Sequence, residues 1–338
     1  MIVSFTDAIC SATEEILSAN PLAYVMGLGA SYPNGADGTL KGLAAKFPGR
    51  IYDTPCSEAA ITGMAVGAAT TGMYPIIHHG RVEFALYAMD AILTQSANWH
   101  SMFGGGYQCP LLIRIAVGRA WSNGAQHTRC NKSMFAVPGL KVVAPSSPHM
   151  AKQLLLAAAK DLNPVIYLES RWLYKIRGAV KNTPCDIGQA QVLRTGTDVT
   201  IVAVADMVIE ALKAAQWLST MDINAEVIDL VSVYPLDIAT VQESVNKTGR
   251  LVAVDAANPA YSTAHEIISN IKAVTATSIT CPDMPCPTAP ALACNYYPTD
   301  QSIIDAVCKA LRIPVPEFKP KTFDQLNLPP KDNFDDLR

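Results

Sequence analysis

A single acid opens a run of small residues, at a position where a helix should begin. Glu58 stands in IYDTPCSEAAITGMAVGAATTG, residues 51 to 72, where alanine, glycine, threonine and small apolar residues predominate. Thr54 and Pro55 come shortly before it, and both residue types favour the start of a helix. We therefore predict that Glu58 lies in the first turn of a helix. There a carboxylate either takes part in chemistry or only complements the helix dipole.

Small residues follow Glu58 at intervals of four. Ala59, Gly63 and Gly67 share one face of the predicted helix, because residues four apart lie above one another. This face has almost no side-chain bulk, so we expect another backbone to pack closely against it.

A second candidate group is a histidine in a loop. His127 lies within RIAVGRAWSNGAQHTRCNKSMFAVPGLKVVAPSSP, residues 114 to 148, which begins with an apolar stretch typical of a strand. Gly124 and the preceding Ser122–Asn123 pair predict a mobile loop. Ligand clefts in open α/β sheets lie beyond the carboxyl ends of the strands, so a histidine here is well placed for proton transfer. A solvated or structural histidine is the alternative.

The composition indicates a two-domain globular protein whose main partners are neither nucleic acid nor membrane. Of its 338 residues 50% are hydrophobic and 16% charged, which suggests that other subunits cover part of the surface. The net charge of −3, with scattered Lys and Arg, argues against nucleic acid. No apolar run reaches the length of a membrane span and the N-terminus lacks a signal-peptide pattern, so we expect a cytoplasmic protein. The nine cysteines should be reduced, and the spacing of Cys281, Cys286 and Cys294 fits no zinc pattern.

Apolar runs of strand type alternate with helical stretches along the chain. The first series, residues 1 to 180, contains AYVMGLG, YPIIHHG, PLLIRIAVG, KVVAPSS and PVIYLES. The second, residues 190 to 312, contains VTIVAVAD, NAEVIDLVSV and RLVAVDAA. This alternation predicts mostly parallel sheets covered on both faces, and therefore two doubly wound α/β domains. Residues 313 to 338 are rich in proline and charge, which predicts an extended tail that is either flexible or a docking segment.

These stretches together resemble a known family. IYDTPCSEAAITGMAVGAA and GAQHTR are similar to segments of the beta subunits of thiamine-diphosphate-dependent 2-oxo acid dehydrogenases of the pyruvate dehydrogenase type. VPGLKVVAPSSP, LNPVIYLE, AEVIDLVSVYPLD, KTGRLVAVD and PDMPCPTAPAL follow in the family's order. The resemblance covers about residues 3 to 312. It implies a pyrimidine-binding domain followed by a transketolase C-terminal-like domain.

The resemblance implies roles for three residues. Glu58 would hydrogen-bond the aminopyrimidine ring of thiamine diphosphate and promote its imino tautomer, which needs a carboxyl group fixed on a rigid helix start. Phe84, in RVEFALYAMD, would stack on that ring, the alternative being an ordinary core residue. His127 matches the family histidine that lines the active site, where imidazole exchanges protons near neutral pH.

The resemblance also points to a cation in the loop before PVIYLES. Asp161 and Asn163 match a loop that binds potassium in related subunits, together with carbonyl groups of Leu111, Ala158 and Ala159. Oxygen atoms of a tight loop suit a hard cation. A plain turn is the alternative, because Asp and Asn favour turns in any case.

One part of the cofactor site is missing from the sequence. Enzymes of this type anchor the diphosphate through magnesium on a Gly-Asp-Gly segment with an asparagine downstream, and the nearest match here, NGADGTLKG, lacks that asparagine. The resemblance therefore implies an alpha-type partner chain that supplies the magnesium site, in an α2β2 assembly with the cofactor at the interface.

Two departures from the family pattern bear on the substrate. Gly27-Leu28-Gly29 stands where dehydrogenase beta subunits usually carry two acids, and HHGRVEF stands where they have a run like EFMTFNF. The second change adds His78, His79 and Arg81. Basic groups beside the substrate cavity would favour a phosphorylated or carboxylated sugar-like substrate.

The function that we predict is that of the beta subunit of a heteromeric thiamine-diphosphate enzyme. It would decarboxylate a 2-oxo acid such as pyruvate and pass the acyl group to lipoamide on a lipoyl transacylase. An alternative is a carbon-carbon ligase of the transketolase or acyloin type, with an aldehyde or sugar as acceptor and no lipoyl complex. A non-catalytic scaffold is a third interpretation, against which Glu58, Phe84 and His127 argue together.

Overall fold

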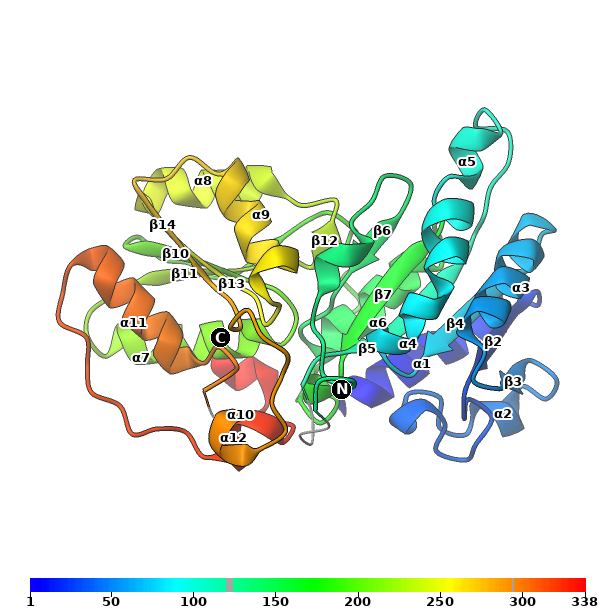
Figure 1. Cartoon of the computed structure of the whole chain (residues 1–338), viewed down its shortest axis with the longest axis horizontal. Helices are drawn as coiled ribbons and strands as arrows, with labels where there is room; N and C mark the ends of the chain where they lie inside the picture. Colours follow the sequence, from blue (N-terminus) through cyan, green and yellow to red (C-terminus); the bar gives the residue numbers. More distant parts are fainter. Residues whose placement is uncertain (120–123, 294) are drawn as a thin grey trace.

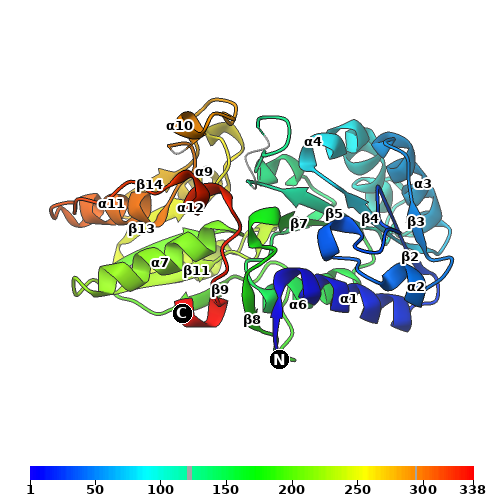
Figure 2. The same ribbon diagram turned by 90° about the horizontal axis from the view of Figure 1, so that it is seen from below.

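Two α/β lobes lie side by side in the computed structural model, which describes residues 1–119, 124–293 and 295–338 (Figure 1). One lobe is built on a seven-stranded sheet and the other on a five-stranded sheet. A small antiparallel pair, β1 (Ile2–Ser4) with β8 (Arg177–Ala179), lies near the junction (Figure 2). The prediction of two α/β units with mostly parallel sheets is confirmed.

The seven-stranded sheet has the strand order β12-β6-β7-β5-β4-β2-β3. Its strands are β2 (Ala23–Gly27), β3 (Ile51–Asp53), β4 (Tyr74–His79), β5 (Leu112–Val117), β6 (Lys141–Val143), β7 (Val165–Ser170) and β12 (Ser232–Tyr234). All neighbours pair in parallel except β12, which is antiparallel to β6. The strands β2, β4, β5 and β7 are buried throughout, which explains their continuous apolar runs in the sequence.

The five-stranded sheet has the order β14-β13-β10-β11-β9, and only β9 is antiparallel. Its strands are β9 (Gln191–Arg194), β10 (Val199–Ala203), β11 (Ala225–Asp229), β13 (Arg250–Val254) and β14 (Thr275–Ile279).

The prediction of a single strand over NAEVIDLVSV is wrong, because this stretch forms two strands, β11 and β12. Val231 has a φ of 62° and turns the chain between them, and its N–H donates to Oδ1 of Asp229 (3.0 Å). β12 then joins the sheet of the other lobe. We propose lobes of residues 1–180 and 190–312, with β12 as the strand that the second lobe contributes to the first sheet.

Helices cover both faces of each sheet. On one side lie α1 (Phe5–Ala19) and α6 (Pro148–Ala158) over the first sheet, and α7 (Met207–Ser219) and α11 (Asp300–Leu311) over the second. On the other side lie α3 (Glu58–Thr70) and α4 (Val82–Ala85), then α8 (Ile238–Thr248) and α9 (Thr263–Asn270). Shorter helices are α2 (Leu43–Lys46), α5 (Trp99–Met102), α10 (Pro290–Ala293) and α12 (Phe323–Asn327). Two apolar cores, one on each side of the sheets, therefore continue through both lobes.

Local sequence signals fix the start of two of these helices. Ser4 and Asp7 form a capping box at the start of α1, each side chain bonding the backbone N–H of the other. At α6 the Ser147 hydroxyl accepts from the Met150 N–H (3.2 Å) and Pro148 takes the first helical position.

The C-terminal segment 313–338 folds back over its own chain. The Lys321 ammonium lies 3.2 Å from Oε2 of Glu210 on α7, and Phe334 and Leu337 are buried. Figure 2 shows this segment running across the junction between the lobes. Of the two alternatives left open for this tail, the contacts favour a docked segment over a flexible arm, because apolar burial and ion pairs hold it against the rest of the chain.

The cysteines that the structure describes are free thiols, and Cys294 lies outside the described residues. Burial raises the pKa of Cys109 and of Cys185 to about 11, so both thiols are protonated at neutral pH. Within the described part of the chain, no group of three or more His, Cys, Asp or Glu side chains is arranged to hold a metal ion. No helix in this part is long and apolar enough to cross a membrane.

Candidate active site

Glu58 begins α3, but a different residue from the expected one precedes the helix. Ser57 is the N-cap of α3, and its side chain makes no capping hydrogen bond. Thr54 lies earlier in the turn, where its backbone N–H donates to Oδ1 of Asp53 (3.0 Å). The prediction that Glu58 lies in the first turn is confirmed, whereas the predicted role of Thr54 at the helix start is wrong.

The Glu58 carboxylate is half-buried and, among the residues that the structure describes, has no ion-pair partner. Thr62, one turn later on the same face of α3, is buried and pairs with His79 at the end of β4 (Oγ1 to Nε2, 3.0 Å). This contact turns the face of Glu58 and Thr62 toward the carboxyl end of β4. The carboxylate therefore stands at the sheet edge where ligand sites form, available to a ligand.

Phe84 and His127 lie together at the same edge of the sheet. Phe84 belongs to α4, directly after β4, and His127 belongs to the loop after β5. Their ring centroids are 5.5 Å apart and the ring planes make an angle of 81°. Because β4 and β5 are parallel neighbours, the segments that follow them meet above the sheet. The Ser122–Asn123 pair of the same loop lies outside the described residues.

Two side chains of the α4 region bond to the backbone of the His127 loop. Nη1 of Arg81 donates to the carbonyl oxygen of His127, and Oε1 of Glu83 accepts from the N–H of Arg129 (2.8 Å). Arg81 is only 5% exposed, and its burial lowers the pKa of the guanidinium. Neither contact was predicted from the sequence, although Arg81 and Glu83 both stand in HHGRVEF.

His78 and His79 are buried structural residues. Burial lowers the pKa of His79 to about 3, so its imidazole is neutral. Nε2 of His78 lies 3.2 Å from Oε1 of Glu169 within the sheet. Arg81 is also buried and bonded to the loop. The expectation that these three basic residues favour an anionic substrate therefore stays a prediction, and the contacts within the chain do not add support to it.

His79 should make the free energy of unfolding depend on pH in the acid range. Its folded pKa is about 3, whereas an unfolded histidine titrates near 6.5. Above a pH of about 6.5 the His79 imidazole is neutral in both the folded and the unfolded chain. Below it, the unfolded chain binds a proton that the folded chain does not, so stability falls as the pH decreases from about 6.5 toward 3. We expect His79→Gln to flatten this part of the profile of urea unfolding against pH.

The control for this prediction is the same change at His265, which is exposed on α9. His265→Gln should leave the slope of the wild-type profile intact. Equal slopes for the two variants would contradict the assignment of the acid sensitivity to His79.

A buried charge network lies beneath the site. Nη2 of Arg114 on β5 donates to Oε2 of Glu169 on β7 (2.9 Å) and to the Thr39 hydroxyl (2.7 Å). Burial alone would raise the pKa of Glu169, but Arg114 and His78 outweigh this effect and lower it. The network connects β4, β5 and β7 directly under the loops that carry the candidate residues. Its members stand inside apolar runs, which is why the sequence analysis did not single them out as a group.

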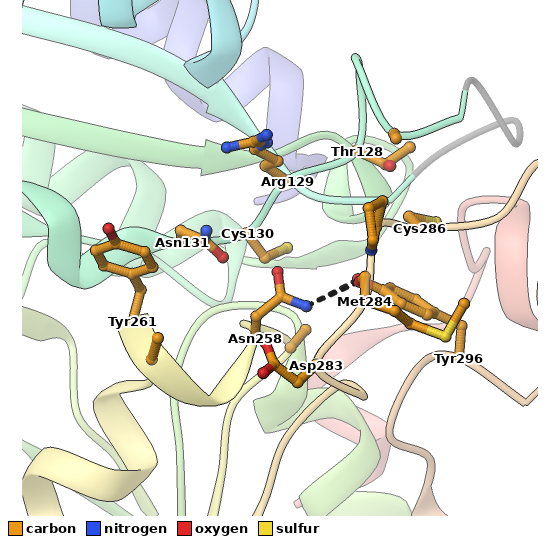
Figure 3. A pocket seen from close by; sticks show the side chains of 14 residues that line it. Thr128, Arg129, Cys130, Asn131, Asn258, Tyr261, Asp283, Met284, Cys286 and Tyr296 are labelled. Carbon is orange, nitrogen blue, oxygen red and sulfur yellow. Dashed lines mark hydrogen bonds between the residues drawn. The ribbon is translucent and has the colours of Figure 1, made fainter.

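Residues that flank His127 line a pocket between the lobes, with a volume of about 260 Å³ (Figure 3). Asn131 lines it with an exposed fraction of 5%, and its Oδ1 has no partner within the described residues. Across the pocket, Nδ2 of Asn258 donates to the carbonyl oxygen of Met284 (3.1 Å). Residues of the His127 loop therefore line one wall of this pocket, and residues of the second lobe line the other.

Two family models match the chain. That of the pyrimidine binding domain of transketolase covers residues 3–177, and that of the transketolase C-terminal domain covers residues 188–303. The chain belongs to the transketolase family. The fold agrees, since a solved structure described as a split gene transketolase, an inactive beta4 tetramer, superposes with a TM-score of 0.76 at 23% identity, over 92% of this chain and 99% of that one.

Curated relatives place the chain among the beta subunits of this family. The mitochondrial pyruvate dehydrogenase E1 component subunit beta-1 of Arabidopsis thaliana is 41% identical over 78% of this chain and 75% of the relative. The acetoin:2,6-dichlorophenolindophenol oxidoreductase subunit beta of Cupriavidus necator is 38% identical over 90% of this chain and 96% of the relative. A subunit of the same description from Bacillus subtilis is 38% identical over 83% of this chain and 85% of the relative. The predicted resemblance is therefore confirmed.

The residues that the resemblance assigns to the aminopyrimidine ring fit such a group. Glu58 offers a half-buried carboxylate that forms no ion pair with any described residue. Phe84 is a half-buried aromatic ring at the same sheet edge. In contrast, NGADGTLKG does not fit magnesium. The Asp37 carboxylate in this segment already pairs with the Arg171 guanidinium (2.6 Å), so a metal ion there would have to compete with this positive charge.

The candidate potassium ligands lie in the turn between α6 and β7. Oδ1 of Asp161 accepts from the Asn163 N–H (3.0 Å), and its Oδ2 pairs with Lys141. Oδ1 of Asn163 is buried and lacks a partner within the described part of the chain. A hard cation would satisfy such an oxygen.

The other proposed ligands are carbonyl groups with partners of their own. The Leu111 oxygen accepts from the Val165 N–H (2.9 Å). The Ala158 oxygen accepts from both the Tyr74 hydroxyl (3.2 Å) and the Asp161 N–H (3.1 Å). Ala159 is the C-cap of α6. A carbonyl oxygen has two lone pairs, so the Leu111 oxygen keeps one for a cation, whereas both lone pairs of the Ala158 oxygen are used. The potassium site stays a prediction.

Proposed function

We propose that this chain is the beta subunit of a heteromeric thiamine-diphosphate enzyme, which decarboxylates a 2-oxo acid such as pyruvate and transfers the acyl group to lipoamide. The observation that carries the proposal is the Glu58 carboxylate on the first residue of α3, which has no ion-pair partner among the described residues and stands at the sheet edge where Phe84 and His127 meet. The alternative of a carbon-carbon ligase is not favoured by the curated relatives, which are named as dehydrogenase and oxidoreductase subunits.

Three side chains have separate roles in this proposal. Bound thiamine diphosphate supplies the carbon nucleophile and stabilises the charge left by decarboxylation. Glu58 shares a proton with the aminopyrimidine ring, Phe84 orients that ring by stacking, and His127 exchanges protons with the reacting group. The rigid start of α3 and the packing of the His127 loop on α4 keep these groups in position.

The proposed partner is an alpha-type chain that carries the magnesium and diphosphate site, in a heterotetramer of two alpha-type and two beta-type chains. Two observations support it. Asp37 is engaged within this chain, and the small-residue face of α3 is exposed. At Gly63 and Gly67 no atom lies within 4 Å of the position that a Cβ would take. The close packing predicted for this face thus has no partner within the described chain, and we propose that another subunit supplies it.

A leucine at Gly63 should therefore affect assembly rather than folding. Gly63→Leu meets open space in the single chain and replaces a poor helix former, so we expect the free energy of unfolding to stay equal or rise by about 0.5–1 kcal/mol. The same side chain should weaken association with the other subunits, measured as the dissociation constant by analytical ultracentrifugation. Ser18→Leu, on the exposed side of α1, is the control. Equal weakening by both variants would contradict the proposal.

The activity is tested on the complex of this chain with its alpha-type partner, supplied with thiamine diphosphate and Mg²⁺. We expect carbon dioxide release from a 2-oxo acid, coupled to reduction of 2,6-dichlorophenolindophenol and to acylation of a lipoyl domain. Acetoin belongs in the substrate panel, because two curated relatives are named as acetoin oxidoreductase subunits. Formation of a new carbon-carbon bond without either acceptor reaction would contradict the proposal and favour the ligase. The lipoyl transacylase partner and the cytoplasmic location stay predictions.

A further inference from the structure

We propose that Arg81 and Glu83 are positioning residues for His127, which clamp its loop to α4 and so fix where the imidazole stands. The proposal rests on the proposed function, because it assigns the pair a role in the same site. Neither residue needs to touch the substrate. Both act through backbone atoms of the loop.

The clamp consists of two hydrogen bonds to the loop backbone at His127 and Arg129, and of one contact with the imidazole ring. Nη1 of Arg81 donates to the carbonyl oxygen of His127, and the Arg129 N–H donates to Oε1 of Glu83 (2.8 Å). Phe84, the residue after Glu83, adds an edge-to-face contact with the His127 ring. Three residues within four positions of one segment thus contact two residues of the loop, His127 and Arg129. Such a pairing restricts both the distance and the rotation of the loop.

The loop itself is a compact turn that needs an external anchor. The His127 N–H donates to the Gly124 carbonyl (3.1 Å), and the Thr128 hydroxyl donates to the same oxygen (2.7 Å). At its end, the Arg129 carbonyl accepts from the Gly118 N–H (2.7 Å) at the end of β5. These bonds shape the turn and attach it to β5. The contacts from Arg81 and Glu83 decide how it faces α4.

Burial and nearby charges favour the hydrogen bond from Arg81 to the His127 carbonyl over other contacts of the guanidinium. Arg81 is 5% exposed, so the guanidinium has few alternative partners in water. The negative charges of Glu83 and Asp37 favour the cation, while the nearby Arg171 opposes it. A charged donor bonded to a carbonyl in such surroundings makes a stronger hydrogen bond than a neutral donor. Arg81 is thus engaged with the loop rather than directed at a substrate anion.

The test uses two matched pairs of variants in the assembled complex. Arg81→Met removes the donor and Arg81→Lys keeps one, while Glu83→Ala removes the acceptor and Glu83→Gln keeps an oxygen there. We expect kcat to fall about tenfold in the Met and Ala variants, because small displacements of a catalytic group are costly, with KM little changed. The Lys and Gln variants should stay near wild type. A rise in KM at constant kcat in Arg81→Met would overturn the proposal and assign Arg81 to substrate binding.

A second readout separates positioning from general structural support. In a His127→Ala background, Arg81→Met and Glu83→Ala should no longer lower kcat, because there is no imidazole to position. A purely structural role would give the same loss in both backgrounds, and this result would overturn the proposal.

Hydrogen exchange of the Arg129 amide tests the clamp without turnover. We expect faster exchange in Glu83→Ala than in Glu83→Gln, measured by mass spectrometry on a peptide spanning 124–131. Equal exchange would overturn the clamp itself. A wild-type complex without decarboxylation would instead refute the proposed function, and the exchange result would then still decide the clamp.

Discussion

Replacing Glu58 with glutamine should lower the turnover of the assembled enzyme by about 100-fold or more. Glutamine keeps the shape of the side chain and its helix position, but it cannot share a proton with the aminopyrimidine ring. Because the wild-type carboxylate has no ion-pair partner within the described residues, its loss should leave folding and assembly intact. Turnover is measured as carbon dioxide release at saturating cofactor, and assembly by sedimentation.

The matched control is Glu266→Gln, because Glu266 is also an acid in the first turn of a helix, α9, and is exposed. If first-turn acids serve only the helix dipole, the two variants should behave alike, with a stability loss of up to about 1 kcal/mol and unchanged turnover. We expect them to differ in turnover. Equal activities would remove the main mechanistic claim.

The second large effect is expected on stability, at Glu169. Glu169→Gln leaves the guanidinium of Arg114 buried without a negative partner, and His78 loses the same carboxylate. Removing one member of a buried ion pair costs about 3–5 kcal/mol, so we expect a loss of this order in the free energy of urea unfolding at neutral pH. Since the pKa of Glu169 is lowered, its contribution is present above the unfolded value and is lost as the pH falls through the folded one.

Glu14→Gln provides the comparison for this loss. Glu14 pairs with Lys46 at the surface, where the Lys46 side chain is 55% and the Glu14 side chain 39% exposed to solvent. A surface pair contributes up to about 1 kcal/mol, so this variant should remain close to wild type. A loss at Glu169 no larger than that at Glu14 would show that the buried network does not support the sheet beneath the site.

Continuous apolar runs predicted the fold well, because buried parallel strands have few polar positions. The runs AYVMGLG, YPIIHHG and PVIYLES became β2, β4 and β7. The prediction of one strand over NAEVIDLVSV failed because the break depends on a positive φ at Val231. A β-branched residue rarely adopts this conformation. For the segment 313–338 the sequence left two alternatives open, a flexible arm and a docking segment. Its prolines and charges are typical of flexible chains, but its scattered apolar residues, including Phe334, pack onto the body of the protein.

The site was predictable in its residue types and less so in its contacts. Glu58 could be placed in a first turn from local signals, whereas the roles of Phe84 and His127 came from the family resemblance. Their contact follows from the adjacency of β4 and β5, which local patterns do not encode. The contacts of Arg81 and Glu83 end on backbone atoms, which carry no signature of residue type.

Native mass spectrometry of the complex purified with thiamine diphosphate and Mg²⁺ tests the central claim most directly, namely that this chain supplies one half of a split active site. We predict a heterotetramer that contains a second kind of chain and two molecules of thiamine diphosphate. Cofactor bound to this chain alone, or a homo-oligomer that neither holds the cofactor nor associates with a second chain, would contradict it.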